Sequence, residues 1–332
     1  MKLHSIFTSH MVFAAGLPIR VYGTGDGVAT ITFNGVTATA VAKDGAWMAE
    51  LPPMPYGGPY TLLADQDGEE TTLTDVYVGE VYLMAGQSNM QYKISETPSP
   101  EVLCEDVPLL RLFGTDRLEK SDRFTPAHGW VTAKKEELPD WTALGYLIGR
   151  SVSRRKDIAV GIIACYQGAS VIESWLPKGI LQENGICLPL TEVHGDHTYR
   201  EFALWNGEGV LYQYALTQVF PFSLSAVVWY QGESDSSEAE GRVYAKELTL
   251  FIETLRKEFL REDLPVAVIQ IADFDQMRTL GWRLIQEAQA EVGRTVPGVT
   301  TIPCADICES DNIHPPTKTL LAERVADLLV TL

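Results

Sequence analysis

An apolar run of five residues, Val81 to Ala85, ends abruptly in the polar sequence Gly86-Gln87-Ser88-Asn89. The run predicts a buried strand, and the polar residues predict a tight turn at its carboxyl end. Open α/β sheets bind their ligands outside the carboxyl ends of their strands. A serine in such a turn has an exposed hydroxyl with backbone N–H groups beside it, which suits a nucleophile. The alternative is that Gly, Ser and Asn only form the turn.

After residue 76 the chain alternates between predicted strands and predicted helices. Apolar runs predict strands at residues 79–85, 158–164, 224–230, 265–272 and 299–303. Helical spacing of apolar residues predicts helices at 143–153, 210–220, 244–259, 282–292 and 321–328. We expect Pro315 and Pro316 to start the last helix. This alternation predicts an α/β fold with a mostly parallel sheet covered by helices on both faces.

Two long segments, 91–140 and 175–206, do not fit the alternation. Each follows a strand that is expected to carry site residues at its end. Long excursions at that place often build a binding pocket.

Residues 1–76 have a different pattern, with short alternating runs separated by turn signals. The predicted strands are 19–23, 29–33, 37–41, 47–51 and 60–64. Asn34-Gly35, between two of these runs, is typical of a tight hairpin. We therefore divide the chain into a small N-terminal β-sandwich domain, 1–76, and an α/β domain, 77–332.

The charge and the cysteines limit the environment and the partners. With 26 basic and 44 acidic residues the net charge is −18, which disfavours nucleic acid and anionic membranes as partners. No run approaches the roughly 18 apolar residues of a membrane span, and the first residues do not resemble a secretory signal. Five scattered cysteines form a poor disulfide framework and lack zinc-site spacing. We therefore expect a cytoplasmic protein without a metal site.

Four polar stretches follow predicted strands and would meet at one edge of a parallel sheet. They are residues 86–89, 166–170, 231–234 and 311–314. Hydrolysis of an ester by serine needs a nucleophile, a base, a group that orients the base, and donors to the oxyanion. Residues that suit these roles occur in all four stretches.

Each role has a candidate. Ser88 is the candidate nucleophile, His314 the base, and Asp311 the carboxylate that orients the imidazole. The backbone N–H groups of Ser88 and Gly168 and the side-chain amide of Gln231 are the candidate oxyanion donors.

A simpler structural interpretation exists for every supporting residue. Asp311 could cap a turn or helix start, and Gly168 could be a plain turn glycine. Gln231 could satisfy buried backbone groups, and Glu233 could pair with an arginine such as Arg283. The joint occurrence of compatible chemistry at four strand ends favours the catalytic interpretation.

Three of these stretches, taken together, resemble a known family. Residues 86–90 (GQSNM), 229–234 (WYQGES) and 311–315 (DNIHP) are similar to the bacterial sialate O-acetylesterases. Those enzymes are similar to carbohydrate esterase family six and belong to the wider SGNH hydrolases. The resemblance extends over nearly the whole chain, through residues 5–13, 76–81, 171–175 and 211–212.

The resemblance implies a flavodoxin-like, three-layer α/β/α hydrolase domain, preceded by the β-domain that such esterases commonly have. Ser88 falls on the family's nucleophile, Gly168 on its second-block glycine, and Asp311 and His314 on its Asp-x-x-His block. Gln231 occupies the place of an oxyanion-hole asparagine in other branches. The implied activity is removal of O-acetyl groups from sialic acid or from acetylated oligosaccharides such as xylan fragments, as an acetyl xylan esterase does. It requires no cofactor.

The chain departs from the family at two places that bear on the substrate. The usual Gly-Gly pair of the second block is Gln167-Gly168, and Asp235 stands where asparagine is frequent. The sequence does not specify the sugar, the acylated hydroxyl or the oligomeric state. A non-catalytic carbohydrate-binding protein on a hydrolase fold and an SGNH lipase or thioesterase are the alternatives.

Further residues are candidates for contact with a sugar. Gln87, Asn89 and Glu233 flank the candidate catalytic residues, and Trp175 could stack on a sugar ring. His194 and His197, three residues apart, are spaced as metal ligands, but no third ligand is evident. We expect these two histidines to lie in an exposed or substrate-lining loop.

Overall fold

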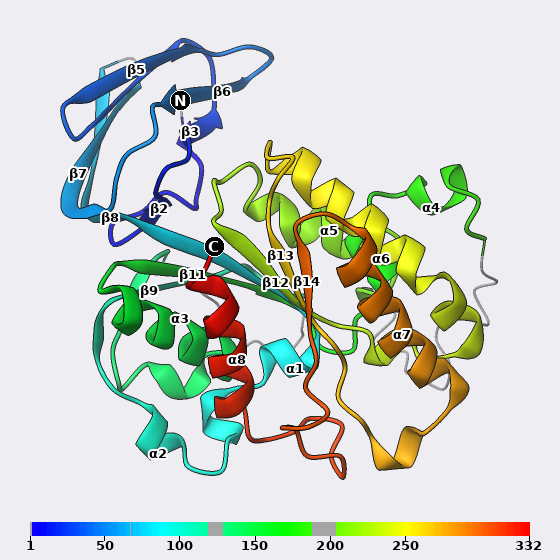
Figure 1. The fold of residues 1–332 in the computed structure, drawn as a ribbon. Coiled ribbons are helices and arrows are strands. Elements are labelled where there is room, and N and C mark those ends of the chain that lie inside the picture. Colours follow the sequence, from blue (N-terminus) through cyan, green and yellow to red (C-terminus); the bar gives the residue numbers. More distant parts are fainter. Residues whose placement is uncertain (1, 67, 119–128, 188–203) are drawn as a thin grey trace.

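The computed structural model describes residues 2–66, 68–118, 129–187 and 204–332, which form a mixed α/β fold (Figure 1). The strands are β1 Lys2–Leu3, β2 Val12–Ala14, β3 Ile19–Thr24, β4 Val28–Phe33, β5 Val36–Val41, β6 Ala46–Leu51, β7 Gly57–Gln66, β8 Glu69–Gly86, β9 Val107–Gly114, β10 Val131–Ala133, β11 Val160–Tyr166, β12 Ala226–Tyr230, β13 Val266–Ile269 and β14 Val299–Ile302. The α-helices are α1 Ser88–Gln91, α2 Pro100–Leu103, α3 Ala143–Lys156, α4 Ile180–Glu183, α5 Val210–Tyr214, α6 Glu238–Glu258, α7 Leu280–Thr295 and α8 Thr319–Leu329. Short 3₁₀ helices are η1 Ile94–Glu96, η2 Leu138–Asp140, η3 Ile172–Trp175, η5 Leu216–Gln218, η6 Glu233–Asp235 and η7 Asp275–Met277.

Most of the described strands belong to one mixed sheet of 11 strands. Its centre has the order β9-β11-β8-β12-β13-β14, and every neighbouring pair in this row is parallel. At the margins, β10 is antiparallel to β9, and β4, β5 and β7 form antiparallel pairs that reach the first half of β8. The predicted parallel arrangement therefore holds for the central row, whereas the sheet as a whole is mixed.

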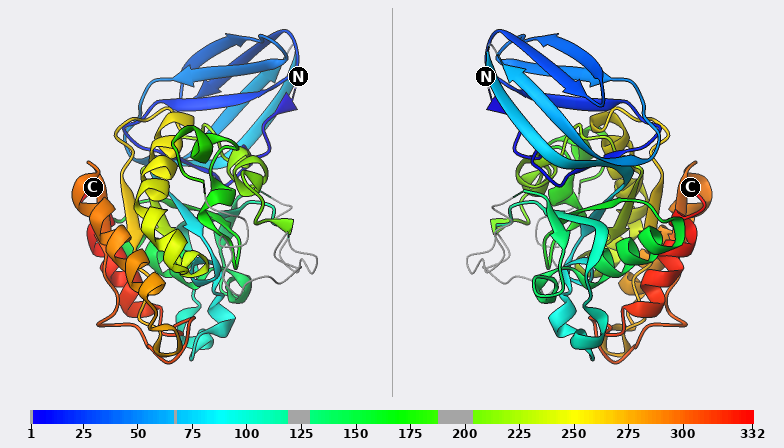
Figure 2. Two further views of the ribbon diagram at one scale, coloured as in Figure 1. Left: turned by 90° about the vertical axis from the view of Figure 1, so that its right-hand side faces the viewer. Right: turned by 90° about the vertical axis from the view of Figure 1, so that its left-hand side faces the viewer.

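The residues of β8 alternate between two hydrophobic clusters, as the period of two in a strand requires. Val81 and Leu83 belong to the cluster that includes the apolar faces of α6 and α7. Tyr82 and Met84 belong to the cluster under α3 and α8. Helices therefore cover both faces of the central strands, and Figures 1 and 2 show α3 and α8 on one side and α6 and α7 on the other. This double burial explains the continuous apolar run in the sequence.

The N-terminal strands agree with the sequence pattern. The five predicted strands correspond to β3 to β7. Asn34 and Gly35, with φ angles of 47° and 76°, connect β4 to β5 in a hairpin in which Phe33 pairs with Val36. Positive φ at both central residues is the geometry of the tight hairpin turn, which explains the Asn-Gly dipeptide.

The N-terminal strands pack onto the α/β part through a shared core (Figure 2). Phe13 stacks on Phe222, with ring centroids 5.8 Å apart. The guanidinium of the buried Arg20 donates to the carbonyl oxygens of Phe259 and Leu260, at 3.2 and 3.3 Å. The predicted boundary after residue 76 falls inside β8, which runs through both parts, and it stays a prediction.

Two predicted helices differ from the structure. The helix expected over 210–220 is divided into α5 and η5, because the side chains of Thr217 and Gln218 bond the carbonyl oxygens of Gln213 and Tyr214 in place of backbone N–H groups. The last helix begins at Thr319, so the prolines at 315 and 316 lie in the preceding loop and do not start it. No helix in the described part of the chain combines the length and the apolar character needed to cross a membrane.

Candidate active site

The turn after β8 lies between the loops that follow its two parallel neighbours. Gly86 is in register with Tyr166 of β11 and Tyr230 of β12. The N–H of Gln87 donates to the Tyr230 carbonyl, and the N–H of Gln167 donates to the Gly86 carbonyl, both at 3.0 Å. Gly86 has a φ of 140°, and a Cβ there would clash with the Tyr230 carbonyl. Glycine therefore allows the three strand ends to meet closely enough to share one site.

Ser88 is the first residue of α1, and its hydroxyl meets the histidine of the last loop. The Nε2 of His314 lies 2.8 Å from the Oγ of Ser88, although 226 positions separate them in the chain. Both side chains are half-buried. A hydroxyl within hydrogen-bond reach of an imidazole is the arrangement of an activated nucleophile.

The surroundings of His314 favour its neutral form. Burial, and next the charge of Lys318, lowers the pKa of the imidazole, while the carboxylate of Glu96 acts in the opposite direction. The ring lies beside Tyr92, with centroids 6.4 Å apart, and the backbone N–H of His314 donates to Asn312 Oδ1 at 2.9 Å. A neutral imidazole can accept a proton, so His314 in this site is suited to act as a general base.

The structure does not join Asp311 to His314. Asp311 is exposed, and its side chain has no hydrogen bond or ion pair with any described residue. It nevertheless lies in the same loop, three residues before the histidine. Catalytic hydrogen bonds are often long in the free enzyme and tighten only with substrate. The orienting role of Asp311 therefore stays a prediction.

Gly168 lies next to Ser88, as an oxyanion donor must. A Cβ at Gly168 would be 3.8 Å from the Cβ of Ser88. The backbone N–H of Gly168 donates to the side-chain oxygen of Gln91 at 2.8 Å. An amide oxygen thus occupies the place beside this N–H, next to the candidate nucleophile. Gln91 is a site residue that the sequence pattern does not indicate, because no motif around it marks it.

The side-chain amide of Gln231, a candidate oxyanion donor, is bonded inside the protein. Its side chain is fully buried, and its amide nitrogen donates to the Ser170 carbonyl at 2.8 Å and to the carboxylate of Asp235. Its amide oxygen accepts from the Tyr244 hydroxyl at 2.7 Å. Both amide hydrogens are therefore used inside the protein, and these contacts match the alternative in which Gln231 satisfies buried groups.

Asn89 connects α1 to the histidine loop and to a buried charge pair. Its amide nitrogen donates to Glu233 Oε1 at 2.6 Å and to the Ile313 carbonyl at 2.9 Å. Its amide oxygen accepts from the ammonium of Lys318 at 2.8 Å. Asn89 is only 1% exposed, so it acts on the site by positioning the residue before His314 and does not meet solvent.

Lys318 is a residue that sequence reasoning missed. It is 1% exposed, and its ammonium lies 4.7 Å from the ring centroid of Tyr92. Burial lowers the pKa of Lys318 to about 8 and raises that of Glu233, while the opposite charges of the two favour ionisation of both. The burial of Lys318 could not be predicted from the sequence, because lysine side chains are usually exposed.

Gln87 and Trp175 complete the expected sugar contacts, and both are internal. The side chain of Gln87 accepts from the N–H groups of Gly232 and Ser234 at 3.2 and 3.3 Å and holds the end of β12. Trp175 is 0% exposed, donates to Ser170 Oγ at 3.0 Å and packs edge-on against Trp229. Contact of a substrate with Gln87, Asn89, Glu233 or Trp175 is therefore not supported, because all four are buried with partners inside the protein.

The remaining expectations concern histidines and cysteines. His194 and His197 lie outside the described residues. All five cysteines are free thiols, and Cys104, Cys165 and Cys304 are buried.

A serine hydroxyl bonded to a histidine at the carboxyl edge of parallel strands is the arrangement of a serine hydrolase. Comparison with known proteins narrows this class. The family model described as "Carbohydrate esterase, sialic acid-specific acetylesterase" matches residues 78–330. The match covers most of the chain, so this protein belongs to that family.

Individual relatives and solved structures agree with the family. The chain is 25% identical to the sialate O-acetylesterase of Homo sapiens and to that of Pongo abelii. Each match covers 94% of this chain and 66% of the relative, so the chain spans about two thirds of the length of these curated relatives. It is also similar to the crystal structure of a carbohydrate acetylesterase from Xanthomonas citri, with a TM-score of 0.82 and 26% identity over 98% of this chain and 73% of that chain.

Proposed function

We propose that this protein is a serine esterase that hydrolyses O-acetyl esters on carbohydrates through an acetyl-enzyme. The observation that carries the proposal is the 2.8 Å contact between Ser88 Oγ and His314 Nε2, inside the region that the family model matches. The similar proteins indicate the substrate class, since they are a sialate O-acetylesterase and a carbohydrate acetylesterase.

The first half-reaction transfers the acetyl group to Ser88. His314 takes the proton from Ser88 Oγ as the oxygen attacks the acetyl carbonyl carbon, and a tetrahedral intermediate forms. Its oxyanion accepts from the backbone N–H groups of Ser88 and Gly168. When the intermediate collapses, the bond from the acetyl carbon to the sugar oxygen breaks, and His314 gives its proton to that oxygen.

The second half-reaction uses the same groups with water. His314 removes a proton from a water molecule that attacks the acetyl-enzyme carbonyl, and acetate leaves as Ser88 Oγ recovers the proton. In the structure the Gln91 side-chain oxygen lies 2.8 Å from the Gly168 N–H, so an oxygen atom fits at this place. Gln91 must withdraw before the acetyl oxygen can bind there.

The proposal extends to the architecture and the environment. The row of parallel strands with helices on both faces supports an SGNH-type three-layer domain over residues 77–332, with residues 1–76 as a β-sandwich domain. Five free cysteines support a reducing compartment such as the cytoplasm. The net charge of −18 supports an absence of nucleic acid and anionic membranes among the partners.

The test is acetate release by the wild type and by Ser88→Ala from three substrates: 4-nitrophenyl acetate, O-acetylated sialic acid and acetylated xylo-oligosaccharides. We expect Ser88→Ala to lower kcat by about three orders of magnitude or more, because it removes the nucleophile. Ser99→Ala is the matched control, since Ser99 is exposed and its side chain caps no helix.

Serine-dependent release from one glycan and not from the other would establish the reaction and the sugar together. Full activity of Ser88→Ala would overturn the proposal. Binding of a glycan with no release of acetate from any substrate would favour a non-catalytic carbohydrate-binding protein.

A further inference from the structure

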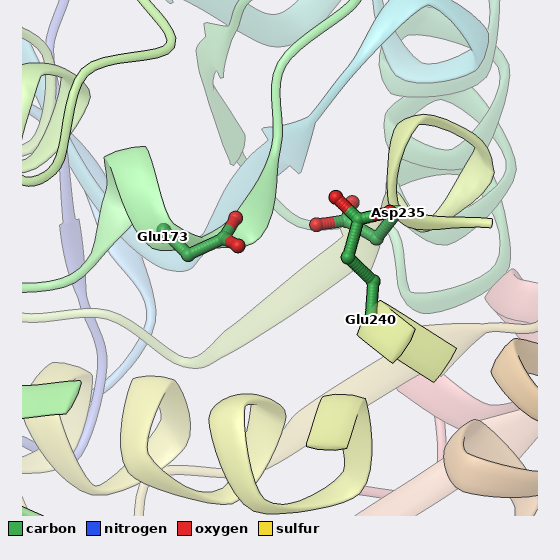
Figure 3. A group of neighbouring side chains, drawn as sticks. All are labelled: Glu173, Asp235 and Glu240. Carbon is green, nitrogen blue, oxygen red and sulfur yellow. The ribbon is translucent and has the colours of Figure 1, made fainter. Parts of the chain in front are cut away.

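Four acidic side chains are buried together on the α6 side of the candidate active site. They are Glu173 of η3, Asp235 of η6, and Glu240 and Glu247 of α6. Glu173 is 6% exposed, and the other three are 0% exposed. Figure 3 shows the carboxylate of Glu173 pointing toward those of Asp235 and Glu240. Ordinary acidic side chains are almost never buried in this way unless they are paired.

The spacing of these carboxylates suits one central ion. One oxygen from each of Glu173, Asp235 and Glu240 lies within 4.8 Å of the others. Oxygen ligands bind Ca²⁺ at 2.3–2.6 Å, so two ligands on opposite sides of the ion are roughly 4.6–5.2 Å apart. The three oxygens can therefore surround a calcium ion without rearrangement of the backbone.

The hydrogen bonds of the cluster leave ligand atoms available. Both oxygens of Glu173, both of Glu247 and Oε1 of Glu240 are buried without a hydrogen-bond partner. The remaining oxygens are used, since Asp235 accepts from the Ile172 N–H at 3.0 Å and from the Gln231 amide, and Glu240 Oε2 accepts from the Ser237 N–H at 3.2 Å. A buried carboxylate without partners costs several kcal/mol unless it binds a proton or a cation. Glu173 in particular points into the cluster with both oxygens unmatched.

The described part of the chain offers no basic side chain in contact with this cluster. Among the described residues, no lysine, arginine or histidine forms an ion pair with any of the four carboxylates. The described residues therefore leave the negative charge of these carboxylates without a balancing charge, which a bound cation would supply.

We propose that Glu173, Asp235 and Glu240 bind a calcium ion, with Glu247 beside it. The ligand set is all oxygen, which selects a hard cation over zinc or copper. Mg²⁺ keeps several water molecules and is rarely held by a dedicated protein cage, whereas Ca²⁺ accepts several carboxylates in flexible geometry. The sequence pattern does not predict this site, because Glu173 lies far from Asp235 and Glu240 in the chain and the three residues have no motif spacing.

The ion would hold together two loops that serve the candidate active site. Glu173 follows Gly168 by five residues, and Asp235 bonds the Gln231 side chain, which in turn bonds the Ser170 carbonyl. The three ligands therefore have a positioning role: they keep the loop after β11 against η6 and α6. None of them contacts Ser88 or His314 among the described hydrogen bonds.

The first test measures the metal directly. Wild-type protein is purified without chelator, dialysed against metal-free buffer, and analysed by inductively coupled plasma mass spectrometry. We expect about one Ca²⁺ per chain, a melting temperature that falls by several degrees with EDTA, and recovery with excess Ca²⁺ but not with equal Mg²⁺. Absence of bound metal, together with a melting temperature that neither EDTA nor Ca²⁺ changes, would overturn the proposal.

A second test uses the variant Glu173→Gln, whose melting temperature is expected to change in opposite directions with and without a bound ion. If Ca²⁺ binds, Glu173→Gln abolishes both the bound calcium and the response of the melting temperature to Ca²⁺, and it destabilises the protein in calcium buffer. If the carboxylates are only a repulsive buried group, the same change removes repulsion and raises the melting temperature, which would contradict the proposal. Glu238→Gln is the control, because Glu238 is exposed and pairs with Arg242 one turn away.

Calcium binding can be tested independently of the proposed esterase activity. Ser88→Ala has no ligand role, so it must keep the bound calcium and the calcium-dependent melting temperature. Loss of calcium binding in Ser88→Ala would mean that the ion belongs to the reaction centre and would overturn the positioning role.

Discussion

The Ser88–His314 pair and the Glu173–Asp235–Glu240 cluster lie in segments that follow the central parallel strands, yet their surroundings are opposite. Ser88 and His314 are half-buried, and the buried polar residue next to them, Asn89, uses both its amide nitrogen and its amide oxygen in hydrogen bonds. In the cluster the acidic residues are buried and five oxygens, counted with Glu247, have no partner.

This difference separates two uses of polar groups at a site. A hydroxyl and an imidazole that contact each other and are still half-exposed to solvent can pass a proton to and from a substrate. Buried carboxylates without partners are costly in free energy, and they become stable when they surround a cation. The first region should therefore govern rate and the second should govern stability. Three predictions in the first region test whether this separation holds.

Of these three predictions, the largest effect is expected for Gln91, whose side-chain oxygen accepts from the Gly168 N–H at 2.8 Å. Gln91→Glu places a carboxylate at that donor, and the negative charge repels the developing oxyanion. We expect kcat/KM for 4-nitrophenyl acetate to fall by about 100-fold, the size of the loss of one oxyanion donor. Gln91→Ala, by contrast, removes the competing acceptor and should retain activity.

Equal activity of the Gln91→Glu and wild-type proteins would exclude the Gly168 N–H as an oxyanion donor. The melting temperature of both variants should keep the calcium response of the wild type. Loss of that response would break the comparison, because the two regions would then act as one unit.

An intermediate effect is expected for Asp311, which is exposed and has no contact with His314 in the free protein. If substrate brings the carboxylate to the imidazole, Asp311→Asn removes its stabilisation of the imidazolium, and kcat falls by about tenfold or more. The measurement is kcat on the acetylated sugar that the wild type prefers. Asp306→Asn is a control of the same chemistry, since Asp306 pairs with Arg324 on another part of the surface. An unchanged kcat would remove Asp311 from the catalytic set.

The smallest expected effect is a shift of the pH profile. His314 must be neutral to accept a proton, so kcat/KM rises with pH through its pKa, which lies below the ordinary 6.5 because of burial and Lys318. Lys318→Met removes a positive charge, raises the pKa of His314 and moves the acid limb to higher pH. Glu96→Gln removes a negative charge and moves the limb to lower pH by a fraction of a unit, because Glu96 is exposed.

Shifts of equal sign in the two variants would contradict the assignment of the acid limb to His314. Because Lys318 is buried and bonds Asn89, its variant is also expected to be less stable, whereas Glu96→Gln should not be. The Glu96 variant therefore tests the electrostatic argument without a change in folding.

Sequence reasoning located the parts of the site that depend on local chemistry. An apolar run that ends in Gly-Gln-Ser-Asn predicted a strand with a serine at its carboxyl end, and β8 and Ser88 lie there. The order of strands and helices predicted that the loop with His314 would reach the same edge. Both inferences rest on the periodicity of apolar residues and on the order of strands and helices, and both of these can be read directly from the sequence.

The roles of the polar neighbours could not be predicted in the same way. Gln231 and Trp175 were expected at an open site, and both are buried with internal partners. A polar side chain has the same sequence signal whether it faces a substrate or satisfies a buried carbonyl, because both uses require hydrogen bonding. Lys318 and Gln91 were missed for the related reason that neither lies in a recognisable pattern.

The sequence alone therefore determined the mixed alternation of strands and helices, the hairpin at Asn34-Gly35, and the pair of residues that meet at the strand ends. Only the tertiary structure decided that Asn89 and Lys318 form one buried network and that Glu173, Asp235 and Glu240 converge. The physical reason is that local conformation depends on neighbours along the chain, whereas the burial and pairing of a charge depend on which distant segments fold against it.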